Sequence, residues 1–254
     1  LLESGAHNLS NQRKAVDAMN VFPVPDGDTG TNMSLTILNG ISEVSKSGSE
    51  SLSTVAKIFS RGLLMGARGN SGVILSQIFR GFAQYAKDKE ELTVKEFSEA
   101  LMNGSKMAYK AVMRPTEGTI LTVVRESAEY GEIYINNHPE ASIEEFVNYI
   151  VDEANASLQR TPELLDVLKE AHCVDSGAMG YVTILEGFKS YLQGKPITEN
   201  LAGDTADTEV HEKASGYRVE YIISLSDNGK KTFKEERVRK QLEQIANDIQ
   251  LAVK

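Results

Sequence analysis

Two aspartates separated by one glycine are the residues of this sequence best suited to chemistry. Asp26 and Asp28 lie in segment 20–33, which reads NVFPVPDGDTGTNM. Carboxylates at this spacing can point at a common cation, and magnesium prefers hard oxygen ligands, some of them supplied by substrate phosphates. A surface Asp-Gly turn that precedes a capped helix has the same spacing. On spacing alone, the metal site and the turn both stay open.

The residues after these aspartates suit an anion. Gly27 and Gly30 let the backbone approach a phosphate closely. A helix is predicted over residues 32–44, and the N–H groups and dipole at a helix start favour negative charge. The residues at this start that we expect to contact phosphate are Thr29, Gly30, Thr31 and Asn32. Carboxylates, glycines and a helix start together predict phosphate binding.

Three further polar loops each open a predicted helix. They are residues 66–72 (GARGNSG), 115–119 (PTEGT) and 174–180 (VDSGAMG). In the first, the Ser71 hydroxyl could hold a phosphate oxygen and Arg68 could add charge. This loop lacks the Gly-Lys-Ser/Thr ending of a Walker A loop. Each loop alone fits an ordinary helix cap, but four of them indicate that several helix N-termini meet at one end, where a nucleotide could bind.

The elements that position these loops are predicted to be helices. Apolar residues recur at helical spacing over residues 9–19, 32–44, 53–65, 73–86, 93–113, 117–136, from 142 onward, 162–171 and 176–192. Thr93 with Glu96 and Ser142 with Glu145 have the spacing of capping boxes. Helix after helix without strands predicts that residues 1–194 form one all-α domain of about eight or nine helices.

The pattern changes after Gly194. Residues 195–215 are polar and are interpreted as a linker. Residues 217–224 alternate as a strand does, a charged helix is expected over 233–249, and a further strand over 251–253. Residues 216–254 are too few to bury a core of their own. We therefore expect them to be the truncated beginning of a second α/β domain, and the N-terminus, which is not Met, to be trimmed.

Composition narrows the function classes. The 254 residues carry a formal net charge of −9, which argues against nucleic acid as the main partner. Cys173 is the only cysteine, which excludes an intrachain disulfide and predicts a reducing, cytoplasmic setting; we interpret it as a packing residue. No apolar run approaches the roughly 20 residues that span a bilayer. The four histidines have no metal-binding spacing.

Segment 20–33 resembles the signature of DhaL-type kinase domains, and more closely that of the ATP-binding subunit of bacterial fatty acid kinase. The motifs ARGNSG (67–72), EGTILT (117–122) and VDSG (174–177) follow in the order of that family. The resemblance covers about residues 1–194. It implies an antiparallel barrel of eight helices that binds a nucleotide at one end.

The resemblance also implies roles for single residues. Asp26 and Asp28 match magnesium-binding aspartates, and Asn20 is the nearest polar candidate for a third ligand, because Val21 stands at the ungapped position. ATP, two magnesium ions and a catalytic contribution from Arg68 are expected. The family's arginine before the last loop falls near Arg160 or Thr161. The residues expected to contact the nucleotide are Thr29, Gly30, Thr31, Asn32, Gly69, Asn70, Ser71, Gly72, Thr119, Ile120, Asp175, Ser176 and Gly177.

In fatty acid kinase, a separate DegV-like fatty-acid-binding carrier protein presents the acyl carboxylate, and the product is an acyl phosphate. A carboxylate is already ionised near neutral pH and needs no general base, so positioning and cations suffice for the transfer. The resemblance implies this carrier as the partner and leaves room for a homodimer formed through the missing C-terminal region. The alternatives are a dihydroxyacetone-type kinase subunit and a nucleotide-binding module without activity. Thr29, where the dihydroxyacetone enzymes carry His, favours the fatty acid kinase.

Overall fold

A computed structural model of the chain describes residues 1–200 and 233–242. The helices are α1 (Leu2–Asp17), α2 (Thr29–Ser47), α3 (Leu52–Met65), α4 (Gly69–Tyr85), α5 (Val94–Ala111), α6 (Ile120–Asn137), α7 (Ile143–Leu164), α8 (Asp166–Glu170), α9 (Ser176–Leu192) and α11 (Glu235–Leu242). No strand occurs in the part of the chain that the structure describes. The predicted all-α domain is confirmed.

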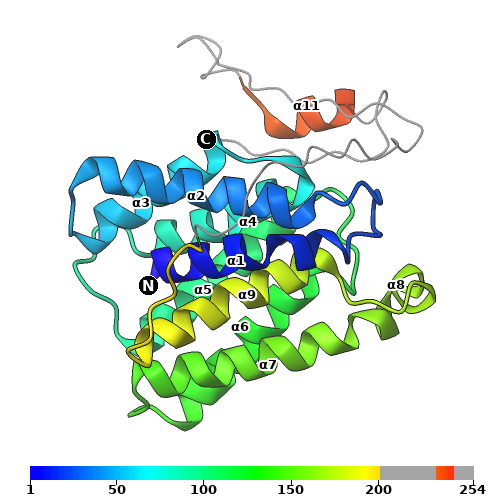
Figure 1. Cartoon of the computed structure of the whole chain (residues 1–254). Helices are drawn as coiled ribbons and strands as arrows, with labels where there is room; N and C mark the ends of the chain where they lie inside the picture. The colour runs from blue at the N-terminus through cyan, green and yellow to red at the C-terminus, as the bar shows by residue number, and fades with distance from the viewer. Residues whose placement is uncertain (201–232, 243–254) are drawn as a thin grey trace.

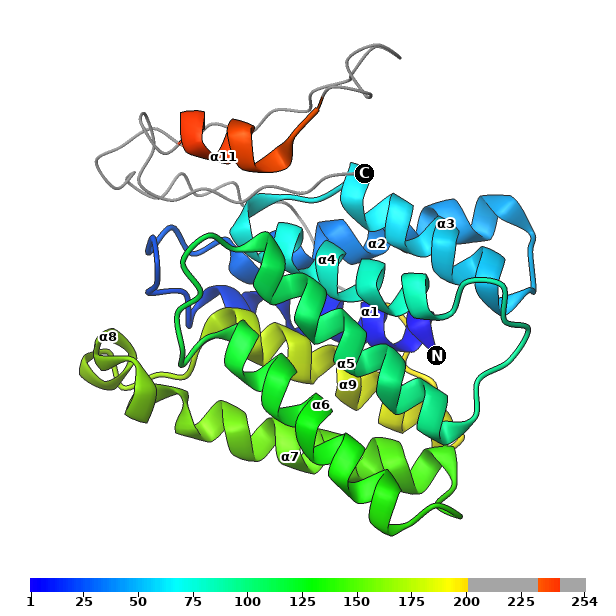
Figure 2. The ribbon, with the colours of Figure 1, turned by 180° about the vertical axis from the view of Figure 1, so that it is seen from behind.

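The long helices of residues 1–200 form a closed antiparallel ring (Figure 1). Each packs on the next from α1 to α7, α9 follows α7, and α9 packs back on α1. The view from behind shows α5, α6 and α7 completing the ring (Figure 2). Leu9, Met33 and Ile184, from three different helices, are almost fully buried in its centre. This arrangement is the expected helical barrel.

Local sequence signals set several helix starts. Thr93 and Ser142 each form the predicted capping box with a glutamate three residues on. Besides α8, four starts lie three or more residues from the predicted position. Helix α1 begins at Leu2 rather than residue 9, α2 at Thr29 rather than residue 32, α4 at Gly69 rather than residue 73, and α6 at Ile120 rather than residue 117. The α6 start is delayed because Gly118 has a φ of +79°, which a right-handed helix cannot include.

Pro162 was expected in the first turn of a short helix, and this prediction is wrong. It lies in the last turn of α7, which runs on to Leu164. Proline has no N–H to donate to the carbonyl four residues back, that of Leu158. The Thr161 hydroxyl donates to that carbonyl instead, at 2.7 Å. A neighbouring side chain thus supplies the lost hydrogen bond, so the helix tolerates proline at this position.

The segment after α9 lies along α1. Ser4 Oγ accepts the Ile197 N–H at 3.0 Å, and His7 Nδ1 donates to the Ile197 carbonyl at 3.2 Å. Asn11 contacts the backbone twice, donating to the Thr198 carbonyl at 3.0 Å and accepting the Asn200 N–H at 2.9 Å. The first part of the predicted linker is therefore held on one face of α1 (Figure 1).

The strands predicted at 217–224 and 251–253 lie outside the described residues. Within the helix predicted over 233–249, the described part is helical from Glu235 to Leu242. The second domain therefore stays a prediction.

Candidate functional site

The four predicted loops lie at one end of the barrel. Because neighbouring helices in the ring are antiparallel, α2, α4, α6 and α9 all begin at the same end. It is the end that carries α8, where the α1–α2, α5–α6 and α7–α9 connections gather (Figures 1 and 2). Helix N-termini carry a partial positive charge and N–H groups that suit an anion.

Hydrogen bonds connect these helix starts in a row. The Arg68 N–H, just before α4, donates to Thr36 Oγ1 on α2 at 3.1 Å. Ser176 Oγ on α9 donates to Thr29 Oγ1 on α2 at 3.2 Å. The N–H of Ile120, the first residue of α6, donates to the Asp175 carboxylate before α9. The structure therefore brings the four motifs together.

The loop between α1 and α2 holds the candidate metal ligands. Asn20 is buried, and its amide donates to Asp26 Oδ1 at 2.7 Å. Asp28 is the N-cap of α2, yet its carboxylate makes no capping bond to that helix. Gly27, between the two aspartates, has a φ of +64°, which suits glycine. Gly27 thus forms a turn between the two aspartates, and the Asp28 side chain does not cap the helix that follows.

The chemistry of these donors fits magnesium. Asp26 and Asp28 are half-buried, and the Asn20 side chain lies within hydrogen-bonding distance of Asp26. Within residues 1–200 and 233–242, no group of three or more His, Cys, Asp or Glu side chains could hold a metal ion alone. Two carboxylates and an amide oxygen are the partial set expected where phosphate and water oxygens complete the octahedron.

Asp17 at the end of α1 also belongs to this site, although sequence analysis missed it. Its carboxylate accepts the Thr31 N–H at 2.9 Å and the Thr31 hydroxyl at 2.7 Å. The Asn32 N–H donates to the Asp28 carbonyl at 2.8 Å. An anion at the start of α2 would therefore meet Thr29 and Gly30 first, or compete with Asp17 for Thr31. No local pattern marks Asp17, because its partner lies on another helix.

Two of the glycines expected to contact the nucleotide, Gly30 and Gly72, also pack closely against neighbouring helices. A Cβ on Gly30 would clash with the Arg13 carbonyl oxygen and lie 2.8 Å from Val16 Cβ on α1. A Cβ on Gly72 would lie 2.5 Å from Thr36 Oγ1 on α2. Both glycines allow neighbouring helices to approach closely, so their role in positioning the loops follows from helix packing.

The start of α4 presents the predicted Arg68, Gly69, Asn70 and Ser71. Arg68 is exposed, whereas Asn70 and Ser71 are half-buried in the first turn. The side chain of its N-cap residue, Arg68, makes no capping hydrogen bond. The same holds for Asp28 at the start of α2, whereas α6 and α9 are capped by the side chains of Thr119 and Asp175.

At the start of α6, Thr119 Oγ1 accepts the Leu121 N–H, which makes Thr119 the cap of this helix. Asp175 caps α9 by accepting the Ala178 N–H at 2.8 Å. Burial raises the pKa of Asp175 to about 6, although N–H groups of Ala178, Ile120 and Gly177 stabilise its ionised form. Thr119, Ile120, Ser176 and Gly177 are buried with it.

Arg160 and Thr161, the residues expected near the family's arginine position, both interact with neighbouring elements. Arg160 pairs with Glu126 on α6 at 2.8 Å. Thr161 is fully buried and accepts the Asp175 N–H at 3.1 Å. Arg160 therefore links α7 to α6, and Thr161 supports the α9 cap.

Cys173 lies next to the metal loop rather than in it. Its thiol points to the Met19 carbonyl, with 3.9 Å between Sγ and O. Burial raises the pKa of this thiol, so the neutral form is favoured. The interpretation of Cys173 as a packing residue agrees with this geometry.

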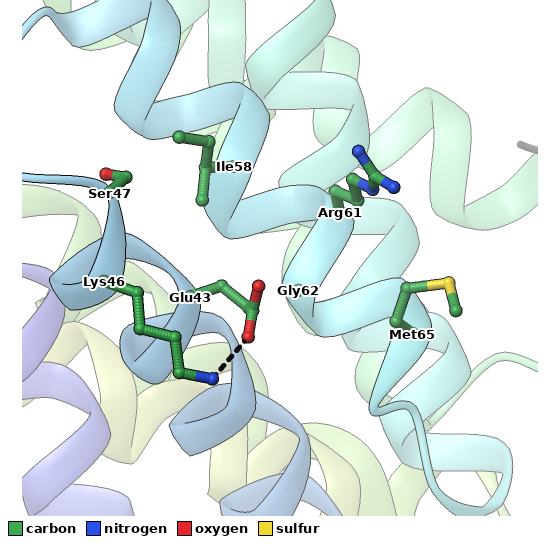
Figure 3. Close-up of a pocket in the computed structure, with 7 residues that line it drawn as sticks. All are labelled: Glu43, Lys46, Ser47, Ile58, Arg61, Gly62 and Met65. Carbon is green, nitrogen blue, oxygen red and sulfur yellow. Dashed lines mark hydrogen bonds and ion pairs between the residues drawn. The ribbon is translucent and has the colours of Figure 1, made fainter. Parts of the chain in front are cut away.

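A pocket on the outer surface lies between α2 and α3, apart from the four loops (Figure 3). Its lining is Glu43, Lys46, Ser47, Ile58, Arg61, Gly62 and Met65. Lys46 and Glu43, both on α2, form an ion pair at 2.8 Å along one side of it, and both are exposed. Because no residue of the four motifs lines this pocket, it is not part of the candidate site.

Ser71→Ala is expected to weaken nucleotide binding mildly, by about 0.5–1.5 kcal/mol, because it removes one neutral hydrogen-bonding group. Calorimetric titration with the magnesium complex of AMP-PNP measures the change. Ser42→Ala, on the exposed surface of α2, is the matched control. If the two variants bind alike, Ser71 contributes only to the start of α4.

None of the helices in the described ranges is both long and apolar enough to cross a membrane. The closed antiparallel ring, together with aspartates and helix starts gathered at one end, defines the class: an all-helical barrel with its polar loops at one end. Residues 23–190 match the DAK2 domain, and the chain belongs to the DAK2 domain family.

Curated relatives share most of this chain. Protein YloV of Bacillus subtilis is 43% identical over 263 residues, covering 98% of this chain and 47% of YloV. An uncharacterized protein of Staphylococcus aureus is 42% identical over 261 residues, with the same coverage of 98% and 47%. The chain thus spans about half the length of the relatives it matches.

Solved structures share the fold. The native dihydroxyacetone kinase of C. freundii superposes with a TM-score of 0.56 at 19% identity, over 75% of this chain and 33% of that one. The same kinase in complex with AMP-PNP and Mg2+ gives 0.56 at 18% identity with the same coverage. At this identity the likeness concerns the fold alone.

Proposed function

We propose that this chain is the ATP- and magnesium-binding part of a phosphotransferase. The observation that carries the proposal is the meeting of four helix starts at the end of the barrel that holds Asp26 and Asp28. Partial positive charge from helix starts and a divalent cation both favour a polyphosphate. The C. freundii kinase with this fold was crystallised with AMP-PNP and Mg2+, which supports ATP and magnesium as ligands.

In this proposal the metal ligands are Asp26, Asp28 and Asn20. We expect the site to bind two magnesium ions. When bound, magnesium offsets the charge of the phosphates during transfer. Asn20 orients Asp26 through their 2.7 Å hydrogen bond. Arg68, exposed just before α4, adds positive charge for the transferring phosphoryl group.

We further propose that the acceptor is a fatty acid carboxylate presented by a separate, DegV-like lipid-binding protein, so that the product is an acyl phosphate. The support is the resemblance of segment 20–33 and the chemistry of the acceptor, since an ionised carboxylate needs no general base. Thr29 is buried and bonded to Ser176. Position 29 thus contributes to helix packing here, whereas a dihydroxyacetone enzyme carries His at this position.

The test is carrier-dependent turnover. The chain, and separately a full-length relative, are incubated with ATP, magnesium and carrier protein loaded with fatty acid. ADP release is measured together with trapping of acyl phosphate by hydroxylamine. Empty carrier and dihydroxyacetone replace the loaded carrier in parallel reactions. Hydroxamate formed only with loaded carrier supports the fatty acid kinase; ADP release with dihydroxyacetone alone supports the small-molecule kinase.

Tight AMP-PNP binding without turnover by either protein would leave a nucleotide-binding module as the function. A homodimer formed outside the described residues is a separate expectation, and sedimentation of the full-length relative measures it.

A further inference from the structure

One carboxylate touches two of the four helix starts. Asp175 is 4% exposed and accepts the Ala178 N–H of its own helix at 2.8 Å. It also accepts the N–H groups of Gly177 and of Ile120, the first residue of α6. Each of these N–H groups belongs to a first helical turn, where no backbone carbonyl is available to accept it. Asp175 therefore satisfies α6 and α9 with a single side chain.

The end of α7 holds this carboxylate in place. Thr161 Oγ1 accepts the Asp175 N–H at 3.1 Å and donates to the Leu158 carbonyl. Gly118, two residues before Ile120, packs on the same turn, where an added Cβ would lie 2.9 Å from the Thr161 carbonyl oxygen. Three helices thus meet around Asp175.

The approach of α6 and α9 is close at this point. A Cβ on Gly177 would lie 3.3 Å from both Ile120 Cβ and Asp175 Oδ2. In each of these contacts, the group that interacts with the Asp175 carboxylate is a backbone N–H of the protein. A buried anion so committed is poorly suited to contact a nucleotide, whose phosphates it would repel.

We propose that Asp175 is a positioning residue that fixes the starts of α6 and α9 relative to each other, and so shapes the nucleotide side of the site without touching the nucleotide. The effect on the nucleotide side of the site rests on the proposed nucleotide binding. The role of Asp175 in fixing the starts of α6 and α9 does not.

The charge state of Asp175 gives the proposal a pH signature. Its pKa of about 6 lies above the ordinary value of 3.8, so the folded protein binds this proton more tightly than the unfolded chain. Ionisation therefore costs stability as pH rises through about 6. The ionised form nevertheless accepts all three N–H groups, and protonation removes part of that capacity. Besides burial, the charge of Asp175 contributes to the raised pKa of the Cys173 thiol. Other titratable or charged side chains on the segments that open α2 and α6, end α7 and precede α9 include Asp28, Glu117, Arg160, Glu163 and His172.

The first experiment is amide hydrogen exchange of wild type and Asp175→Asn at pH 8. Exchange at Ile120, Gly177 and Ala178 is expected to become at least about tenfold faster in the variant, since hydrogen bonds to a charged acceptor are the stronger kind. Asp166→Asn, an exposed aspartate at the start of α8, is the control. Unchanged exchange at Ile120 would overturn the proposal, whether or not nucleotide binds.

The second experiment measures the affinity for AMP-PNP with magnesium between pH 5 and pH 8. The ratio of variant to wild-type Kd is expected to fall from about tenfold at pH 8 toward one at pH 5, where the wild-type carboxyl is also neutral. A purely structural role predicts a constant ratio and a lower Tm at every pH, which contradicts the proposal. Because both proteins bind the same nucleotide, its own titration cancels in the ratio.

Variants of Thr161 provide a second test in case Asp175→Asn does not fold. Thr161→Ser keeps the hydroxyl that supports Asp175 and should retain wild-type exchange and affinity, whereas Thr161→Val should change both in the direction of Asp175→Asn. Equal behaviour of the Ser and Val variants would contradict the proposal. If wild type itself binds no AMP-PNP, the proposed function fails while the exchange result still decides the role of Asp175.

Discussion

Asp28→Asn is expected to lower magnesium-dependent ATP affinity or turnover by at least about 100-fold. Replacing even an outer-shell partner of a metal site typically costs 10–100-fold, and Asp28 supplies one of the two carboxylates that we propose as metal ligands. The amide keeps the shape of the side chain but removes the anion. Its geometry as N-cap of α2 rests on backbone contacts rather than on its carboxylate, so the fold should survive.

The measurement is a titration with AMP-PNP at several magnesium concentrations, with ADP release followed wherever turnover is found. Asp166→Asn removes an exposed carboxylate at the same end of the barrel and serves as the control. A variant with wild-type affinity, rate and magnesium dependence would contradict the metal site and restore the surface turn as the role of Asp28.

Gly30→Ala is expected to lower the free energy of unfolding by about 3 kcal/mol, the upper end of the usual cost of overpacking. The added methyl would clash with the Arg13 carbonyl oxygen and lie 2.8 Å from Val16 Cβ. These are backbone and first side-chain atoms of α1, so they cannot rotate away. The gain of up to about 1 kcal/mol that alanine normally brings to a helix is overwhelmed.

Urea denaturation of wild type and variant measures this change. Gly72→Ala is the graded comparison, because its methyl would meet the Thr36 hydroxyl, which can turn at the loss of its bond to the Arg68 N–H. Gly72→Ala should therefore cost less than Gly30→Ala. A larger loss of stability in Gly72→Ala than in Gly30→Ala would show that α1 and α2 can move apart more easily than their geometry indicates.

The loop from Asn20 to Asp28 depends on the same contact. Gly30 lies two residues after Asp28, and Thr31 is held by Asp17 on α1. If the Gly30→Ala variant stays folded, its magnesium dependence should also weaken, since the start of α2 must move away from α1.

Local chemistry explains which parts of this structure could be predicted. The capping boxes at Thr93 and Ser142 and the chain of helices follow from patterns within a few residues. Pro162 was misplaced because a proline is read as a helix start, while the hydroxyl that compensates for it belongs to the preceding residue. The packing roles of Gly30 and Gly72 could not be predicted because the atoms that crowd them lie on other helices.

By itself, the sequence determined the helical character of residues 1–194 and the positions of the four polar loops, one of them with Asp26 and Asp28, that we propose to carry the chemistry. Only the tertiary structure decided which groups in those loops are already committed. Asp17 holds Thr31 across 14 residues, and Ser176 bonds Thr29 across 147. Asp175 joins the starts of α6 and α9. The physical reason is that helix periodicity and caps arise between near neighbours, whereas the partner of a buried polar group is set by which helices the closed ring brings together.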